Sequence, residues 1–109
     1  TIKKIMSSFE EREKSFEKKF VRDAELQFKV SAKRNRYLAE WVIEKIGKSE
    51  NEKEDYIKEV IKSDFAEPGD EDVFRKIKSD FQKASVTIED SEIRHQMTLT
   101  LDRAKKDFL

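Results

Sequence analysis

Apolar residues recur every three or four positions in four segments of the chain, a pattern that predicts amphipathic helices. Three of these segments are of ordinary length and carry one apolar stripe each: Tyr56, Ile57, Val60, Ile61 and Phe65; then Val73, Phe74, Ile77, Phe81 and Ala84; then Ile93, Met97, Leu101, Ala104 and Phe108. Four helices joined by short connections predict an all-α fold, specifically an antiparallel four-helix bundle.

Turn-forming and helix-capping residues divide these segments at three places. Glycine can adopt the left-handed conformation that ends a helix, and the side chains of Ser, Thr and Asp accept hydrogen bonds at a helix start. The places are residues 47–52, with Gly47 as a C-cap and Ser49 with Glu52 as a capping box; residues 67–72, with Pro68 and Gly69 in a turn and Asp70 as an N-cap; and residues 84–90, with Thr87 or Asp90 as an N-cap.

The first segment is much longer than the others. On a continuous helix, one face of about 100° would hold Ile5, Phe9, Phe16, Phe20, Ala24, Leu38, Trp41 and Val42. A helix from Phe9 to Ile46 would be about 57 Å long, against roughly 20–30 Å for the other three. The sequence therefore predicts a long first helix whose N-terminal part projects past the bundle, folds back or stays disordered. The stripe lapses at Ser31, Arg34 and Asn35, which predicts that burial changes along this helix.

These lengths divide the chain into an N-terminal arm, residues 1–21, and a bundle, residues 22–109. In the arm, Phe9, Phe16 and Phe20 share one helix face, and nearly all other positions between them are charged. Such a short helix is marginal alone in water, and it gains stability when its apolar face is buried. One interpretation is that the face enters a groove on a partner. The other, which fits the pattern equally well, is that the rings pack on the bundle itself. The excess length of the first segment favours the partner.

Composition excludes several classes of function. Charged residues make up 44% of the chain, but eight Phe, two Tyr and one Trp allow a small core. There is no cysteine, and the single histidine, His95, lies off its apolar stripe, so we expect it on the surface and expect no transition-metal site. No catalytic constellation or phosphate-binding loop is present. The sequence thus predicts a binding protein that is not an enzyme and has no cofactor.

The longest apolar run covers residues 41–43, far short of the roughly 20 residues of a membrane span, which predicts a soluble, cytoplasmic protein. Net charge is zero overall but +5 over residues 1–48, −7 over 49–72 and +2 over 73–109. A strong basic excess is typical of nucleic-acid binders, so we expect no nucleic-acid partner. With Lys29, the residues Lys33, Arg34 and Arg36 form a small basic patch. Two interpretations of this patch remain open: it binds a nucleotide or another anion, or it is an ordinary solvated face.

Several runs in order along the chain resemble one protein family. They are Phe-Glu-Glu-Arg-Glu-Lys-Ser-Phe-Glu-Lys-Lys-Phe at residues 9–20, Asp-Ala-Glu-Leu-Gln-Phe-Lys at residues 23–29, Arg-Asn-Arg at residues 34–36, Trp41, and Asp-Phe-Ala-Glu-Pro-Gly-Asp-Glu-Asp-Val-Phe-Arg-Lys at residues 64–76. Over almost its whole length the chain looks like the zeta subunit of alphaproteobacterial F-type ATP synthases. The family pattern starts near a methionine shortly before the first phenylalanine, which matches Met6 and leaves residues 1–5 as an extra stretch.

The resemblance implies a four-helix bundle preceded by an inhibitory arm. In that family the arm enters the catalytic head of the synthase at an α/β interface near the γ shaft and blocks rotation in the hydrolytic direction. By position, it assigns partner binding to Phe9, Arg12, Glu13, Phe16, Lys19 and Phe20. The expected partners are the α, β and γ subunits. The protein itself is expected to be a monomer when free and not to insert in the membrane. A relative that binds the synthase without inhibiting it is the alternative.

Overall fold

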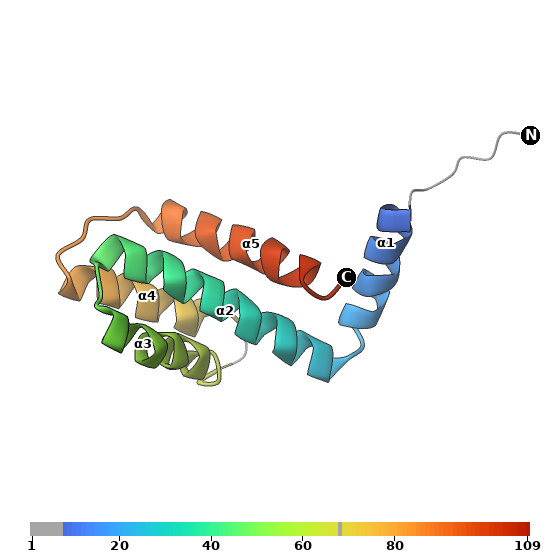
Figure 1. Cartoon of the computed structure of the whole chain (residues 1–109), viewed down its shortest axis with the longest axis horizontal. Helices are drawn as coiled ribbons and strands as arrows, with labels where there is room; N and C mark the ends of the chain where they lie inside the picture. The colour runs from blue at the N-terminus through green and yellow to red at the C-terminus, as the bar shows by residue number, and fades with distance from the viewer. Residues whose placement is uncertain (1–7, 68) are drawn as a thin grey trace, which may run out of the picture.

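The computed structural model describes residues 8–67 and 69–109, which form five α-helices (Figure 1). The helices are α1 (Ser8–Phe20), α2 (Ala24–Ile46), α3 (Glu50–Ser63), α4 (Glu71–Lys83) and α5 (Asp90–Lys106). The prediction of an all-α fold is confirmed, and no strand occurs in the described residues. The prediction of one long first helix is wrong, because that segment is divided between α1 and α2. Ile5, Pro68 and the side chain of Phe9, which the sequence singled out, lie outside the described part.

The break between α1 and α2 is made by Asp23. Its backbone is extended, with φ −107° and ψ 101°, and its carboxylate accepts a hydrogen bond from the Leu26 amide at 3.1 Å. An aspartate in this position caps the new helix and so favours a fresh start over continuation. The Gln27 side-chain amide donates to the carbonyl oxygen of Phe20 at 2.8 Å, which ties the end of α1 to the first turn of α2.

The other helix boundaries fall near the predicted places. Gly47 has φ +84° and donates its N–H to the Ile43 carbonyl at 2.7 Å, the left-handed cap that was expected. At the start of α3 the Ser49 hydroxyl donates to the Glu52 carboxylate at 2.8 Å. Hydrogen bonds from the side chain and backbone of Ser49 lower the pKa of Glu52. The predicted capping box is therefore only partly formed, because the Ser49 side chain makes no capping hydrogen bond to the backbone of α3. The N-cap of α5 is Glu89, rather than Thr87 or Asp90.

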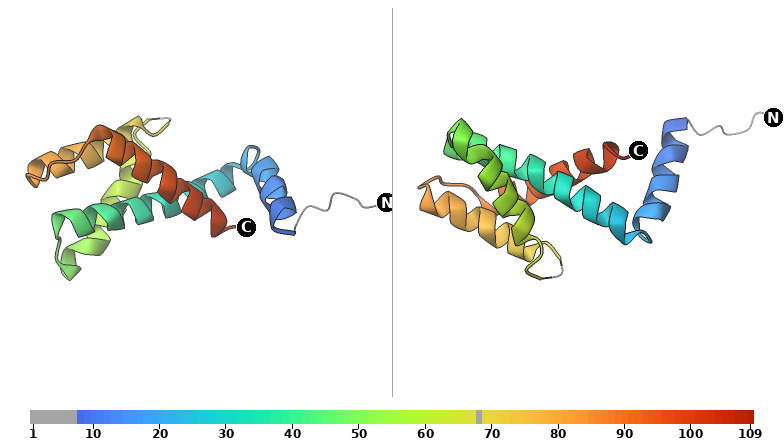
Figure 2. Two further views of the ribbon diagram at one scale, coloured as in Figure 1. Left: turned by 90° about the horizontal axis from the view of Figure 1, so that it is seen from above. Right: turned by 60° about the horizontal axis from the view of Figure 1, so that its bottom comes forward.

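The hydrophobic core is built around α2, which is the longest helix and contacts all four others. Its central part packs with α3, α4 and α5 in a main cluster: Leu38, Ala39, Val42, Ile43, Tyr56, Ile57, Val60, Val73, Phe74, Ile77, Phe81, Ile93 and Met97. Trp41 packs against this cluster, and the centroid of its ring lies 5.3 Å from that of Phe81 in an edge-on arrangement. Figure 2 shows that α3 and α4 lie towards one end of the molecule and α1 at the other. None of the helices described has the length and apolar character needed to cross a membrane.

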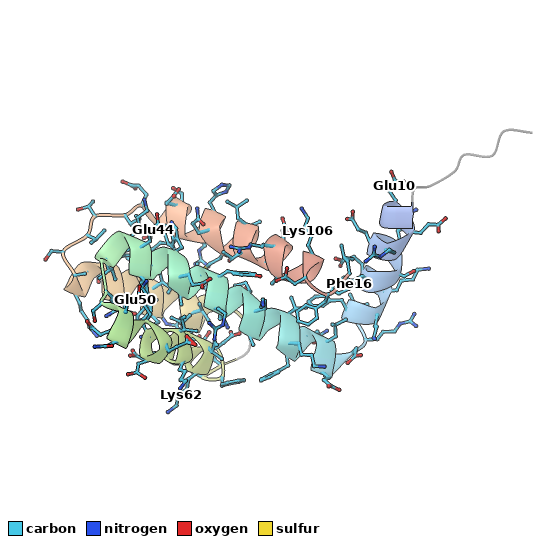
Figure 3. All side chains as sticks on the ribbon, in the orientation of Figure 1. Glu10, Phe16, Glu44, Glu50, Lys62 and Lys106 are labelled. Carbon is cyan, nitrogen blue, oxygen red and sulfur yellow. The ribbon has the colours of Figure 1, made fainter. Side chains whose placement is uncertain are left out.

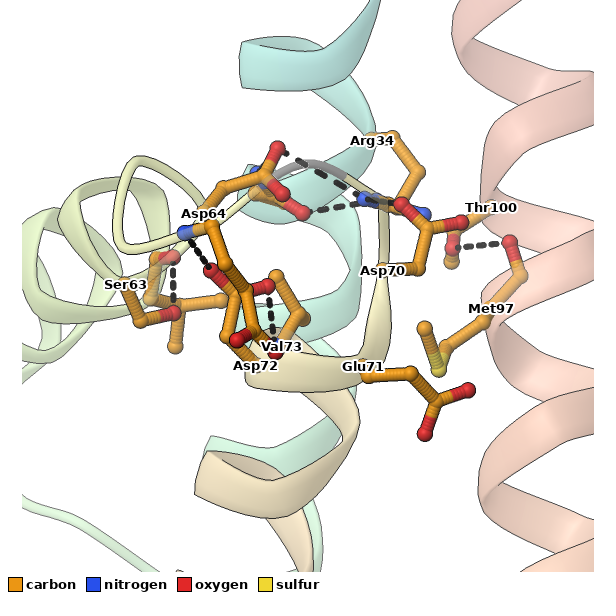
Figure 4. A network of polar contacts seen from close by, with 12 residues as sticks. Arg34, Ser63, Asp64, Asp70, Glu71, Asp72, Val73, Met97 and Thr100 are labelled. Atoms are coloured by element: carbon orange, nitrogen blue, oxygen red, sulfur yellow. Dashed lines mark hydrogen bonds and ion pairs between the residues drawn. The ribbon is translucent and has the colours of Figure 1, made fainter.

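A buried polar network joins α2 to the connection between α3 and α4 (Figure 4). Arg34 donates to the Asn35 side-chain oxygen at 2.6 Å, and its guanidinium lies 3.1 Å from the Asp70 carboxylate and 3.7 Å from that of Asp64. Asn35 donates to Asp64 at 3.0 Å. Burial does change along this segment, from the exposed residues 27–29 to Arg34 and Asn35, which are only 2% and 1% exposed. The lapse of the apolar stripe at residues 34 and 35 therefore marks buried polar side chains and not a loss of burial. Within the described residues, no buried side-chain polar atom lacks a hydrogen-bond partner.

Asp64 gives this network a pH dependence that can be measured. Burial raises its pKa, and this outweighs the lowering by the Asn35 hydrogen bond and the Arg34 charge. A carboxyl whose pKa is higher in the folded state stabilises fully below its unfolded pKa and loses that contribution as pH rises through the folded pKa. We therefore expect the stability of the wild type relative to Asp64→Asn to fall as the pH rises from about 3, below the unfolded pKa of an aspartate, through the raised pKa of the folded protein.

Urea unfolding of both proteins across this pH range measures the difference. Asp55→Asn, at an exposed position of α3, supplies the control for losing one negative charge. A wild type that gains stability relative to Asp64→Asn as the pH rises would show that Arg34 and Asn35 outweigh the cost of burial.

Candidate partner-binding site

Helix α1 lies across the end of the molecule where α2 begins and α5 ends (Figure 1). Phe16 projects from it towards the other helices (Figure 3) and is only 8% exposed. It packs in a second apolar cluster with Leu26 and Val30 of α2 and Ala104 of α5. This cluster is separate from the main core, so α1 depends on a small contact area of its own.

Phe20 completes the apolar face of α1. Its ring stacks on that of Phe16, with centroids 5.9 Å apart and planes at 17°. Lys105 of α5 places its ammonium 4.7 Å from the centre of the Phe20 ring and 3.3 Å from the carboxylate of Glu17. One lysine therefore contacts both an aromatic ring and a carboxylate of α1, and it is the main polar link between α1 and α5.

The charged residues assigned to partner binding lie outside this contact. Arg12, Glu13 and Lys19 are all exposed. Arg12 and Lys19 border an open cleft of about 450 Å³ between α1 and the C-terminal residues Phe108 and Leu109. In the free protein these three side chains thus face the solvent, where a partner could reach them, while the two described phenylalanines face inward.

The inward position of Phe16 and Phe20 matches the interpretation that the rings pack on the bundle. The length mismatch that favoured a partner disappears because the segment is broken at residues 21–23 and α1 lies across the end of the molecule (Figure 1). Sequence reasoning missed the residues that receive the rings, above all Leu26, Val30 and Lys105. Ala104 and Leu101 do belong to the predicted α5 stripe, but nothing local indicated that α1 would meet them.

The basic residues considered for anion binding are not gathered on one open surface. Lys33 lies 4.0 Å from the Asp107 carboxylate, and Arg36 lies 3.1 Å from that of Glu54. Arg34 is buried in the network described above, and the neighbouring Lys29 pairs with Glu25 at 3.1 Å. An anion would have to compete with a carboxylate at each position. His95 is exposed, as expected.

A family model described as ATPase inhibitor subunit zeta matches residues 6–107. The chain belongs to the ATPase inhibitor subunit zeta family. The match confirms the resemblance seen in the sequence, and it spans α1 as well as the four helices that form the main core. The zeta pattern therefore includes the helix with the two inward phenylalanines. No sequence among the curated proteins searched matches this chain.

Proposed function

We propose that this zeta-family protein inhibits ATP hydrolysis by an F-type ATP synthase, and that α1 is the part inserted into the catalytic head. The observation that carries the proposal is the construction of α1 as a separate amphipathic helix. It presents two phenylalanines on one face and exposed charges on the others, inside the region that matches an inhibitor family. A helix of this type is suited to enter an apolar groove on a partner.

Separation of the two apolar clusters makes insertion physically feasible. Releasing α1 would open the cluster around Phe16 but would leave the main core between α2, α3, α4 and α5 intact. Phe16 and Phe20 would then exchange their contacts with α2 and α5 for contacts with the catalytic head. Burying one phenylalanine is worth about 1.5–3 kcal/mol, so moving the already buried Phe16 is roughly neutral. The exchange is then driven by fuller enclosure of the partly covered Phe20 and by the contacts of the other side chains of α1.

The exposed charges of α1 set the orientation of the inserted helix in this proposal. Arg12 and Lys19 lie seven positions apart and hence on the same side of the helix, about two turns apart, while Glu13 follows Arg12 directly. Complementary charges contribute to register and association rate more than to affinity. Wedged at an α/β interface beside the γ shaft, a helix fixed in this way would stop rotation in the hydrolytic direction.

Deletion of residues 1–20 tests the proposal. We expect the shortened protein to stay helical, because the main core does not include α1, and to lose inhibition completely. The measurement is ATP hydrolysis by the isolated catalytic head over a titration of each protein, with circular dichroism as a check of folding. Deletion of residues 1–5, which precede the family match, is the matched control and should retain inhibition.

Two results would go against the proposal in different ways. Full inhibition by the protein without residues 1–20 would exclude α1 as the inserted part. Tight binding of the full-length protein to the head with unchanged hydrolysis would identify a relative that binds without inhibiting.

A further inference from the structure

Two phenylalanine rings are stacked on the outside of the molecule, away from α1. Phe28 of α2 is 53% exposed, and Phe65, in the turn after α3, is 62% exposed. Their ring centroids are 5.6 Å apart with planes at 18°. Neither belongs to either of the apolar clusters. Among the large apolar side chains that the structure describes as exposed, these two form a stacked aromatic pair.

The buried polar network fixes the backbone next to one of these rings. The residue before Phe65 is Asp64, whose carboxylate accepts from Asn35 and faces the guanidinium of Arg34. The Phe65 amide donates to the Lys62 carbonyl at 3.1 Å, which extends the turn of α3 up to the ring. Phe28 is carried by the regular helix α2. A surface that is already ordered loses less conformational entropy on binding, which favours an interaction role.

Two lysines of α3 supply positive charge on the side of Phe65, within a segment, residues 49–72, whose net charge is −7. Lys58 and Lys62 are exposed on α3, seven and three positions before Phe65, so helical spacing brings them to the same side. Figure 3 shows Lys62 pointing away from the other helices. Neither lysine forms an ion pair with any described residue, whereas Lys29, beside Phe28 on α2, is paired with Glu25. The patch therefore combines two apolar rings with two available cations.

We propose that the Phe28–Phe65 patch is a second contact with the ATPase, and that it receives an acidic helix with one apolar side. An apolar side chain of that helix would cover the two rings, while its carboxylates would meet Lys58 and Lys62. The inference rests on the proposed function of α1. Phe28 lies eight positions after Phe20, a span below about 29 Å even in an extended chain, so the patch lies close to any surface that receives α1.

Binding of the full-length protein to the isolated catalytic head tests this contact. We expect Phe28→Ser combined with Phe65→Ser to weaken binding about tenfold or more, as for a central aromatic contact. Lys58→Glu combined with Lys62→Glu should slow association and reduce its dependence on salt. Leu99→Ser is the matched control, since Leu99 is 46% exposed on α5 and belongs to no aromatic pair. Its affinity should equal that of the wild type.

The outcomes separate this inference from the proposed function. Wild-type affinity in the double phenylalanine variant overturns the second contact, even when deletion of residues 1–20 abolishes inhibition. Weakened binding in that variant with unchanged or tighter binding in the double lysine variant overturns the acidic nature of the partner helix. Inhibition that survives deletion of residues 1–20 contradicts the role of α1, whatever the patch contributes. Because both lysines are exposed, their variant remains informative even where loss of the rings affects folding.

Discussion

Replacing Arg34 with alanine is expected to lower the free energy of unfolding by about 3 kcal/mol. The guanidinium is nearly fully buried and faces the carboxylates of Asp64 and Asp70. Its removal leaves Asp64, which is mostly buried, without its cation, and leaves Asn35 without one hydrogen-bond donor. The expected loss is at the lower end of the range for breaking a buried ion pair because Asp70 is half exposed and can be solvated. Chemical denaturation followed by circular dichroism measures it.

Arg36→Ala is the control for this measurement. Arg36 lies on the same helix and pairs with Glu54 through two hydrogen bonds of 3.1 and 3.3 Å, but both side chains are exposed. Exposed ion pairs contribute about 0–1 kcal/mol, so this variant should be close to the wild type. Equal losses in the two variants would contradict a structural role for burial of Arg34.

Local patterns predicted the parts of the fold that depend on neighbours in sequence. The apolar stripes of α3, α4 and α5 lie in the core at most of the predicted positions, and Gly47 ends α2 as its conformational freedom suggested. These features follow from helical spacing and from caps that act within one turn. The match to an inhibitor family likewise depends on the order of residues along the chain.

Contacts between distant parts of the chain account for the wrong predictions. The sequence suggests that Arg34 is an exposed cation, because no partner lies near it in the chain. Its partners, Asp64 and Asp70, lie 30 and 36 positions away. The break before α2 had a local signal, Asp23 followed by an acidic first turn, but the apolar stripe continued across it and concealed it. Where α1 then lies is decided by Ala104 and Lys105, at the opposite end of the chain.

Docking of α1 on the free protein should limit how much of the protein can inhibit, and a substitution of Lys105 tests this. In the proposed mechanism only the released form of α1 can enter the catalytic head, because Phe16 is buried and Phe20 is partly covered in the docked form. When the binding-competent form is a minor population, the apparent dissociation constant is the intrinsic constant divided by the released fraction. Weakening the docked form should therefore strengthen inhibition.

Lys105→Glu is expected to lower the concentration needed for half-maximal inhibition about five- to tenfold. The substitution removes the ion pair with Glu17 and the ammonium above the Phe20 ring, and it places two carboxylates side by side. The lost contacts are worth about 1–1.5 kcal/mol together. Their loss therefore raises the released fraction of α1 about five- to tenfold. Amide hydrogen exchange of residues 10–20 should rise in parallel, while α3 and α4 stay protected because the main core does not include Lys105.

Lys83→Glu provides the matched control, since it makes the same change in charge at an exposed position of α4, far from α1 in sequence and fold. It should alter neither the inhibition nor the exchange of α1. Faster exchange in Lys105→Glu with no gain in inhibition would mean that release of α1 is not limiting. Weaker inhibition would mean that Lys105 itself contacts the ATPase. A gain in both quantities, absent from Lys83→Glu, would tie the contact that holds α1 on the free protein to the availability of the inhibitory helix.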